Sequence, residues 1–447
     1  LRDAEEQQLR IEEQVRTLLH QIDDAQRALD GLREADTRAQ EETTLLGEQL
    51  TDYRRRLGDA WPSEERSAAQ REMRTPWLDA EIDEARAQLF LAALRLHEDF
   101  LASTAGQMLE GLRAAMDVVG GQAPRNLPRE AVRAAWQMLF LVVPLVSTTF
   151  ASYGRMFAGL GQEDLGWLLI DEAGQAAPQY AVGAIWRSKR VVAVGDPLQL
   201  EPVVTMPRKA MLDIAAYYAV DCQWLPPRAS VQTLVDRVAR FGTTLHQEGR
   251  PVWVSAPLTV HRRCDDPMFT LCNTIAYDGI MISGVAAHTD PADLFDGADG
   301  ARVAPSEWID VPADERGSHL QQQQIARLRT LIVELGHRGV KPSQIIAISP
   351  FRAVARALEE VRRDFPGLQG GTIHTAQGRE ADVVVLVLGG DPDRRGAKAW
   401  ASETVNLVNV AASRAKRRLY VIGDRVEWER YNYFSQLSQA LRSPVRR

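Results

Sequence analysis

The amino-acid sequence predicts an α/β protein with parallel sheets, preceded by a helical coiled-coil hairpin. Between Ile11 and Leu96, apolar residues recur at alternating steps of three and four, which is the spacing of a coiled-coil seam. After residue 121, short β-branched runs alternate with helical segments, which is typical of parallel α/β sheets. A length of 447 residues with 45% hydrophobic content allows two or three domains with substantial cores.

Residues 1–120 are predicted to form an antiparallel helical hairpin. The apolar repeat runs to Leu57 and returns from Leu78 on a helix that we expect to reach Val119, with proline-containing breaks between the two arms. Such a hairpin is either a spacer whose seam closes on itself or an arm that docks a protein partner. The same seam can also close between two chains.

Six short apolar runs are the strands expected after the hairpin. The region at about 202–257 is predicted to contain a helix at 231–241 and then a Gly- and Pro-marked stretch, and we expect it to be a hinge between two sheets. Residues 284–315 are predicted to be an irregular surface insertion. We therefore expect a first lobe at 121–250, a second lobe at 251–430, and a C-terminal helix and tail at 431–447. The runs are 141–147, 167–170, 191–194, 345–349, 383–388 and 419–422.

Composition excludes some classes of protein and leaves others open. The longest apolar run, 138–146, is interrupted by Pro144 and is shorter than the roughly 18 residues that span a bilayer, so no membrane segment is predicted. Three widely spaced cysteines indicate a reducing, cytoplasmic setting without disulfides or zinc. A net charge of -7 neither requires nor excludes a nucleic-acid partner, because a groove needs only local basic residues.

An acidic pair follows the apolar run 167–170 directly. Ligands bind at the carboxyl ends of parallel strands, so Asp171 and Glu172 are candidate site residues. The first acid can hold Mg²⁺ on a triphosphate, and the second can orient and polarise the attacking water. The alternative is that the pair caps a helix N-terminus.

A second strand-end motif follows the run 191–194. It reads Gly-Asp-Pro-Leu-Gln-Leu-Glu-Pro over 195–202, and its neutral Gln199 can hydrogen-bond both a γ-phosphate and a water. A plain turn would explain a Gly-Asp-Pro sequence alone. Two strand-end motifs in this order and spacing favour a nucleotide site.

These motifs resemble those of superfamily 1 helicases, which are AAA-type, RecA-like ATPases, in the branch that includes the nonsense-mediated-decay RNA helicase. The resemblance covers about residues 141–424 and keeps the family order. It implies two RecA-like P-loop NTPase lobes, ATP and Mg²⁺ as cofactors, and movement toward the 3′ end of a single strand of RNA or DNA. The matching stretches are 171–175, 195–202, 258–267, 345–351, 372–382 and 409–416.

The resemblance also implies roles for residues of the second lobe. Arg263 takes the place of a phosphate-contacting arginine and Arg414 that of an arginine finger, and a permanently charged guanidinium suits both tasks. Glu380 is implied to contact the nucleotide, together with Gln377 and Gly378. The sequence departs from the family pattern at 261, 354 and 413, where His, Val and Ser replace the usual Gln, Gln and Thr.

Contacts to nucleic acid are expected from two threonines. Thr375 is implied to link the nucleotide state to the bound strand, together with Gln377. Thr148 lies in a segment that resembles one that touches the sugar-phosphate backbone, and the alternative is that its hydroxyl caps a helix. No stripe of basic and aromatic residues predicts sequence-specific recognition.

The chain contains no phosphate-binding Gly-Lys-Ser or Gly-Lys-Thr loop, because none of its lysines follows a glycine. In the family this loop precedes the second motif, so we expect it upstream of Leu1, with the hairpin inserted in the first lobe. The chain by itself is then expected to hydrolyse ATP poorly or not at all. The sequence thus predicts an ATP-dependent helicase or translocase. The alternative is a nucleic-acid-binding or coiled-coil scaffold without ATPase activity, although retention of the polar site residues argues against it.

Overall fold

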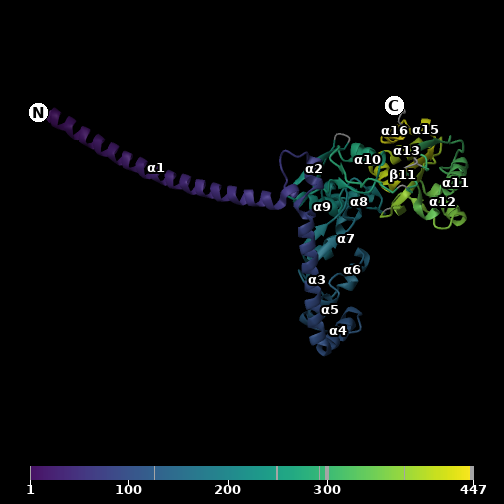
Figure 1. The fold of residues 1–447 in the computed structure, drawn as a ribbon, viewed down its shortest axis with the longest axis horizontal. Helices are drawn as coiled ribbons and strands as arrows, with labels where there is room; N and C mark the ends of the chain where they lie inside the picture. Colours follow the sequence, from purple (N-terminus) through teal and green to yellow (C-terminus); the bar gives the residue numbers. More distant parts are fainter. Residues whose placement is uncertain are drawn as a thin grey trace. The chain divides into compact units, whose positions relative to one another are not determined.

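The computed structural model describes residues 2–124, 126–247, 250–290, 292–296, 302–376 and 378–442. The chain divides into two compact units, Leu1–Glu98 and Asp99–Arg447. Helices dominate the first unit, whereas the second contains all the described strands (Figure 1). None of the described helices combines the length and the apolar character needed to cross a membrane.

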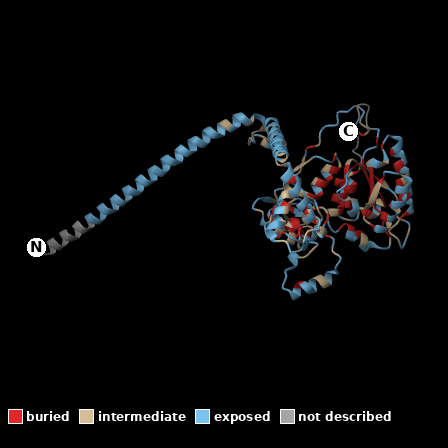
Figure 2. Ribbon diagram, turned by 90° about the horizontal axis from the view of Figure 1, so that it is seen from below, coloured by how far each residue is buried: buried red, intermediate tan, exposed pale blue. Residues whose placement is uncertain are grey.

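The first unit is built around one long helix, α1 (Arg2–Leu57). The helix is supported locally by pairs such as Arg27–Asp24 and Arg55–Asp52, which lie one turn apart. It is pale blue, and therefore exposed, over nearly all of its described length in Figure 2. The unit continues with η1 (Gly58–Ala60), α2 (Ala68–Met73), η2 (Pro76–Leu78) and the first part of α3 (Ala80–Ser103).

The seam expected to close in an antiparallel hairpin is open. Leu18 and Leu32 on α1 are 56% and 68% exposed, and Leu89 on α3 is 71% exposed. The first helix is as predicted, but the second, expected to reach Val119, is divided at Thr104 into α3 and α4 (Ala105–Val119), and the predicted packing of the two arms is absent from the described residues. The seam of α1 contains Asp36 and Thr43 and runs for 56 residues, whereas α3 has only 24, so the two arms offer little matched apolar surface to bury.

The first lobe of the second unit is formed by short helices around a two-stranded parallel sheet, with β1 (Leu165–Ile170) beside β2 (Ser188–Ala193). Trp136 is buried at its centre, with its ring centroid 4.7 Å from that of Phe157. The helices of this lobe are α4 (Ala105–Val119), α5 (Arg129–Val142), α6 (Phe150–Met156), α7 (Pro178–Trp186), α8 (Arg208–Tyr217) and α9 (Val231–Val238).

The prediction of a strand at 141–147 is wrong. Residues 141 and 142 end α5, and residues 143–149 form no regular element. Leu145 is exposed, so this run has no sheet neighbour against which to pack. Pro144, which cannot donate to a strand ladder, also disfavours a central strand here.

The predicted hinge contains more regular structure than expected. The helix expected at 231–241 is present as α9, and the described residues also form α8, a short 3-10 turn, η4 (Cys222–Trp224), and an antiparallel pair, β3 (Gly242–Gln247) and β4 (Arg250–Ser255). Asp236 of α9 anchors this pair, because its Oδ1 accepts hydrogen bonds from the backbone and hydroxyl of Ser255. The segment therefore connects the lobes through an ordered hairpin.

The second lobe is built on a five-stranded sheet in which every pairing is parallel, in the order β7-β11-β10-β8-β9. The neighbouring strands β8 and β10 are rich in β-branched residues and buried except at Asp382, as a parallel sheet covered on both faces requires. Red residues gather in this part of Figure 2. The strands are β7 (Glu307–Asp310), β8 (Ile345–Ser349), β9 (Gln369–Thr372), β10 (Ala381–Val387) and β11 (Ala415–Gly423).

Two groups of helices cover this sheet. One group packs on the strands through α11 and α12, which also contact each other, and the other does so through α10 and α14. The C-terminal helix expected within 431–447 corresponds to α16, and the shorter α15 lies before that segment. The predicted insertion at 284–315 contains β7. The helices are α10 (Met268–Ala276), α11 (Gln322–His337), α12 (Arg352–Asp364), α13 (Arg395–Ala401), α14 (Asn406–Ser413), α15 (Arg425–Trp428) and α16 (Phe434–Ala440).

Candidate nucleotide site

The loops that follow β1 and β2 are held against each other by backbone contacts. Ala173 N donates to Val194 O at 2.9 Å, and Val194 N donates to Ile170 O at 2.8 Å. A Cβ on Gly174 would lie 2.8 Å from the carbonyl oxygen of Asp196, so only glycine permits this approach. The two strand-end motifs found in the sequence therefore meet at one edge of the sheet.

The acidic pair occupies the exit from β1. Glu172 has a left-handed backbone conformation, with φ 53° and ψ 40°, which is uncommon for a residue other than glycine. Its amide donates to Asp171 Oδ1 at 2.9 Å. Its side chain makes no cap hydrogen bond to the following 3-10 turn, η3 (Ala173–Gln175), so the helix-capping alternative lacks support. Asp171 is exposed, and its carboxylate is the kind of oxygen ligand that Mg²⁺ prefers.

Gln199 and Arg414 join the two lobes. Arg414, just before β11, donates from Nη2 to Gln199 Oε1 at 2.8 Å. The arginine is only 3% exposed. Burial lowers its pKa, the charge of Arg263 lowers it further, and the carboxylate of Glu172 raises it. Within the described residues Arg414 Nε has no hydrogen-bond partner, so this buried cation still has a donor to offer.

A second charged group of the same lobe lies beside Arg414. Glu380 forms ion pairs with Arg263 Nε and Lys416 Nζ, both at 2.6 Å. The hydrogen bond from Lys416 is the main reason that the pKa of Glu380 is lowered, and the charge of Arg263 adds to it. Arg263 also donates to Ser413 O at 3.4 Å. Gly378 lies in the turn before Glu380, with a positive φ of 74°.

The sequence did not single out a polar network that crosses from the first lobe to the second. Asp196, in the loop after β2, accepts hydrogen bonds from the hydroxyl of Tyr277 and from the Leu198 amide. Asn409 donates to Leu198 O and to Tyr277 Oη, both at 2.9 Å. Burial raises the pKa of Asp196, and the negative charge of Glu172 adds to the increase.

Part of this network could have been recognised from the spacing of two asparagines in the sequence. Asn406 and Asn409 are three residues apart, so they lie on the same face of α14, and Asn406 donates to the backbone of Gln199. Two amides on one face of an otherwise apolar helix indicate buried polar partners. Tyr277 ends the apolar helix α10, and nothing in its local sequence indicates a partner 81 residues away.

Other predicted residues lie outside this cluster or outside the described residues. Thr148 is in the irregular segment before α6, and among the described hydrogen bonds and ion pairs none joins it to Gln199, Arg414 or Glu380. Thr375 is exposed on the 3-10 turn η6 (His374–Ala376) and donates to Thr372 O at 2.8 Å. Gln377 is not among the described residues.

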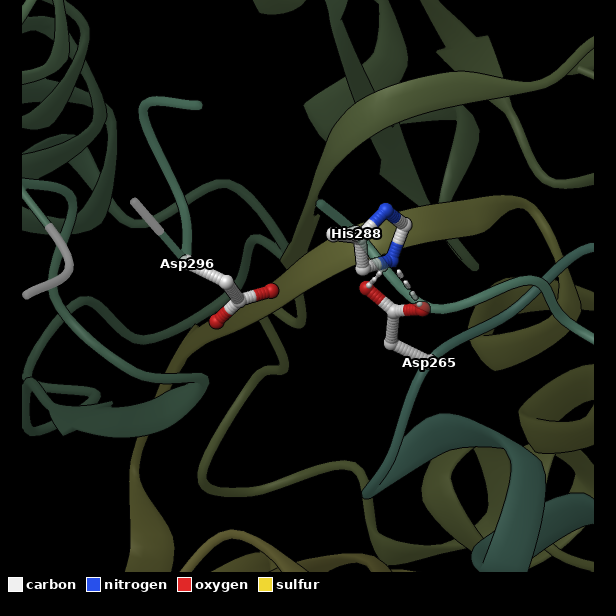
Figure 3. Close-up of side chains that lie close together, drawn as sticks. All are labelled: Asp265, His288 and Asp296. Atoms are coloured by element: carbon white, nitrogen blue, oxygen red, sulfur yellow. Dashed lines mark hydrogen bonds and ion pairs between the residues drawn. The ribbon is translucent and has the colours of Figure 1, made fainter. Parts of the chain in front are cut away.

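A separate cluster joins Asp265, His288 and Asp296 (Figure 3). His288 Nε2 lies 2.9 Å from Asp265 Oδ1. Arg417 forms ion pairs with both acids at 2.8 Å, and with Asp293 at 2.7 Å. Because the Arg417 guanidinium already neutralises these carboxylates, the cluster ties Asp265, Asp293 and Asp296 to β11 by ion pairs rather than forming a metal site.

Two α/β lobes with parallel strands, which bring acids, a glutamine and arginines together between them, have the architecture of RecA-like domains. Comparison with protein families agrees: residues 126–207 and 243–426 each match a family described as an AAA domain. The two family matches and the relatives described below support a place in helicase superfamily 1, in the branch of the nonsense-mediated-decay helicase.

The relatives of the chain are helicases and regulators of nonsense transcripts. It is 23% identical to the Regulator of nonsense transcripts 1 homolog of Neurospora crassa, over 74% of this chain and 29% of that protein. Identity is 24% to a probable helicase of Dictyostelium discoideum, over 63% of this chain and 27% of the relative. The Arterivirus nonstructural protein 10 helicase structure matches with 19% identity and a TM-score of 0.28, over 62% of this chain and 41% of that one. The chain spans about a quarter of the length of these curated relatives.

Proposed function

We propose that this chain supplies the hydrolytic and coupling residues of an ATP-dependent helicase or translocase that acts on single-stranded RNA or DNA. The observation that carries the proposal is the hydrogen bond from Arg414 to Gln199, beside Glu172. This hydrogen bond joins a residue of the first lobe to a residue of the second. In a two-lobed ATPase, such a contact makes hydrolysis depend on how the lobes are closed.

In this proposal each polar residue has a defined task. Asp171 holds Mg²⁺, which would neutralise phosphate charge, and Glu172 orients the attacking water. Arg263 and Arg414 stabilise charge on the γ-phosphate of ATP. Their guanidinium groups can do so because they are permanently charged and offer forked donors. Gln199 senses the phosphate through its amide.

The remaining residues connect ATP to the strand. Glu380, Gln377 and Gly378 contact the nucleotide, and Glu380 keeps Arg263 and Lys416 together. Thr375 and Thr148 contact the sugar-phosphate backbone through their hydroxyls. Opening and closing of the lobes around a strand would convert each hydrolysis into one step.

The test is hydrolysis of ATP stimulated by a single strand, measured on the full reading frame that contains this chain, because the 447 residues include no Gly-Lys-Ser or Gly-Lys-Thr loop. We expect stimulation by oligo(U), oligo(dT) or both, and loss of at least about 100-fold in kcat for Glu172→Gln. Glu163→Gln is the matched control, since Glu163 also has a positive φ but lies before β1. Unchanged turnover in Glu172→Gln would refute the catalytic assignment.

One observation supports a second candidate function. The seam of α1 is exposed along its described length, which suits a helical protein partner. If the full reading frame hydrolyses no ATP with any strand, the chain acts as a scaffold through α1, and the site residues have lost their catalytic use.

A further inference from the structure

The seam of α1 is an apolar stripe that is open in the described structure (Figure 2). From Val15 to Tyr53 it extends for about 57 Å at the usual helical rise. Its large apolar side chains are between 42% and 68% exposed. A helix of this length gains most of its stability by packing such a face, and α3 with its 24 residues is too short to cover it. The exposed side chains are Val15, Leu18, Ile22, Leu29, Leu32, Leu46, Leu50 and Tyr53.

Two polar residues interrupt the seam and decide which helix fits it. With Val15 at position a of a heptad, the repeat continues in register to Tyr53, and Asp36 and Thr43 both fall at a. The Thr43 hydroxyl donates to Ala39 O of its own helix at 2.7 Å, so it keeps this hydrogen bond when it is buried. The Asp36 carboxylate carries a charge, which is costly to bury unless a cation lies against it. The partner helix must therefore place a basic residue beside Asp36.

A second copy of α1 in antiparallel orientation meets this requirement. When the two-fold axis passes beside Glu34, every a position faces a d position of the other copy, and the whole described seam is covered. Asp36 then lies opposite Leu32 of the second copy and next to Arg33 of that copy. The facing pairs are Val15 with Tyr53, Leu18 with Leu50, Ile22 with Leu46, Ala25 with Thr43, Leu29 with Ala39, and Leu32 with Asp36.

The contacts that Asp36 and Arg33 make within one helix leave both available to a second copy. Gln40 donates to Asp36 Oδ2 at 2.9 Å, and no described hydrogen bond uses Asp36 Oδ1. Arg33 forms an ion pair with Asp30 at 3.3 Å, in which the two side chains are 70% and 71% exposed. Because such an exposed pair contributes little to stability, Arg33 can turn toward Asp36 of the other copy at little cost.

Parallel pairing of two copies is disfavoured by the same carboxylate. Each residue would then face its own counterpart, so the two Asp36 carboxylates would lie in one layer of the seam without a cation between them. The arginines that end α1, Arg54, Arg55 and Arg56, would also gather at one end of the pair. The antiparallel order separates these arginine clusters by the length of the seam and places an arginine beside each Asp36.

We propose that this chain forms an antiparallel homodimer through residues 15–53 of α1. The inference goes beyond the proposed ATPase function, because none of the seam residues belongs to the candidate nucleotide site. It assigns the exposed seam to one partner, a second copy of the chain, rather than to a different helical protein.

Disulfide cross-linking tests both the partner and its orientation. The 447-residue chain with Cys222→Ser is the background, because Cys222 is exposed whereas Cys264 and Cys272 are buried. Leu18→Cys and Leu50→Cys are introduced into separate chains, which are mixed under reducing conditions and then oxidised. We expect a covalent dimer from the mixture and none from either variant alone. In the antiparallel pair the two copies of residue 18 are about 48 Å apart, far beyond the roughly 7 Å that a disulfide allows between Cα atoms.

Two other results of the cross-linking would overturn the inference. Covalent dimers from each variant alone would show that the helices pair in parallel. Absence of cross-links from the mixture, or their loss when the same cysteines are placed in the full reading frame, would show that a different helix covers the seam.

Two adjacent leucines provide a matched pair of variants. Leu46 lies in the seam and Leu45 lies outside it, although they are 56% and 55% exposed. In sedimentation equilibrium we expect Leu46→Glu to weaken dimerisation at least about tenfold, because it buries a charge against Ile22 of the second copy. Leu45→Glu is expected to change the dimer dissociation constant by no more than about twofold. Equal dimerisation of the two variants would place the interface elsewhere on the chain and refute the proposal.

A third variant tests whether Asp36 sets the orientation. Asp36→Leu removes the charge that disfavours parallel pairing, so the chain should still dimerise but in both orientations. Leu50→Cys alone should then form a covalent dimer in the Asp36→Leu background. An unchanged cross-linking pattern would contradict the role given to Asp36.

Discussion

Asp196 illustrates how single residues couple the two lobes. Its carboxylate accepts hydrogen bonds from Tyr277, the Leu198 amide and Gln199, so every neighbour that touches it is a donor. Burial nevertheless raises its pKa, because the loss of hydration destabilises the charged carboxylate more than these hydrogen bonds stabilise it. The charged form of Asp196 therefore depends on each donor, and two of the three belong to its own loop.

Tyr277→Phe removes the donor that comes from the second lobe. We expect the free energy of unfolding to fall by about 1–3 kcal/mol near neutral pH, since a buried carboxylate loses a hydrogen bond. An acid with a raised pKa in the folded state favours folding at low pH, and this contribution is lost as the pH rises. The free energy of unfolding of the variant should therefore differ most from that of the unaltered chain at pH values where Asp196 is ionised, and least in mild acid.

Urea unfolding of both proteins at neutral pH and in mild acid measures this difference. Tyr217→Phe is the control, since Tyr217 is 82% exposed and its hydroxyl is in water, and we expect a change within about 0.5 kcal/mol. A loss for Tyr277→Phe that is equal at both pH values would show that the hydroxyl does not act through Asp196.

The sequence predicts site residues whose positions are set locally better than those whose partners are distant. Asp171 and Glu172 could be proposed because they directly follow an apolar run, and Gln199 because it lies in the loop after the next run; strand ends meet at one edge of a parallel sheet. Tyr277 could not, because its partner is set by how α10 packs beside the first lobe. Contacts between residues far apart in sequence depend on tertiary packing, which a local pattern does not encode.

At the scale of elements, the turn after β10 fixes how the helices meet the sheet. Gly389 N donates to Gln324 Oε1 on α11 at 2.8 Å, and Gly389 O accepts from Trp428 Nε1 on α15 at 3.2 Å. The glycine has a φ of 60°, and an added Cβ would collide with the carbonyl oxygen of His319. The backbone of one residue thus ties two helices to the central strand.

Gly389→Ala is expected to lower the free energy of unfolding by at least about 2 kcal/mol, from the left-handed backbone and the collision with His319. Gly396→Ala is the matched control, because Gly396 lies in α13 with open space around its Cα, where alanine is expected to stabilise by about 0.4–1 kcal/mol. Thermal and urea unfolding measure both. Equal stability of the two variants would contradict the role given to this turn.

Elements with strong, short patterns could be predicted from the sequence. The run 345–349 coincides with β8, and the runs near 383–388 and 419–422 lie within one residue of β10 or inside β11. The run 141–147 has the same β-branched character but no neighbouring strand, so hydrogen bonding did not favour a sheet there. The coiled-coil repeat likewise predicted α1 but not its partner, because a seam specifies burial without specifying which helix provides it.

At the scale of the molecule, the two lobes differ in how completely their sheets are covered. Val383 to Val387 in β10 are fully buried within a large core. In β1, Trp167 and Leu169 are each 61% exposed, and Val192 and Val194 at the end of β2 are also exposed. A two-stranded parallel sheet with one exposed face buries less apolar surface per hydrogen bond. We therefore expect its local unfolding to require less free energy than that of the five-stranded sheet.

Hydrogen exchange measured by mass spectrometry should reveal this difference. We expect amides of β10 and β11 to exchange only through global unfolding, and amides of β1 and β2 to exchange on the order of 10–100 times faster after correction for intrinsic rates. Peptides from β8, whose residues are all buried, provide the internal reference. Equal protection of the two sheets would mean that the contacts of Arg414 and Tyr277 with the first lobe are strong enough to make both lobes unfold as one.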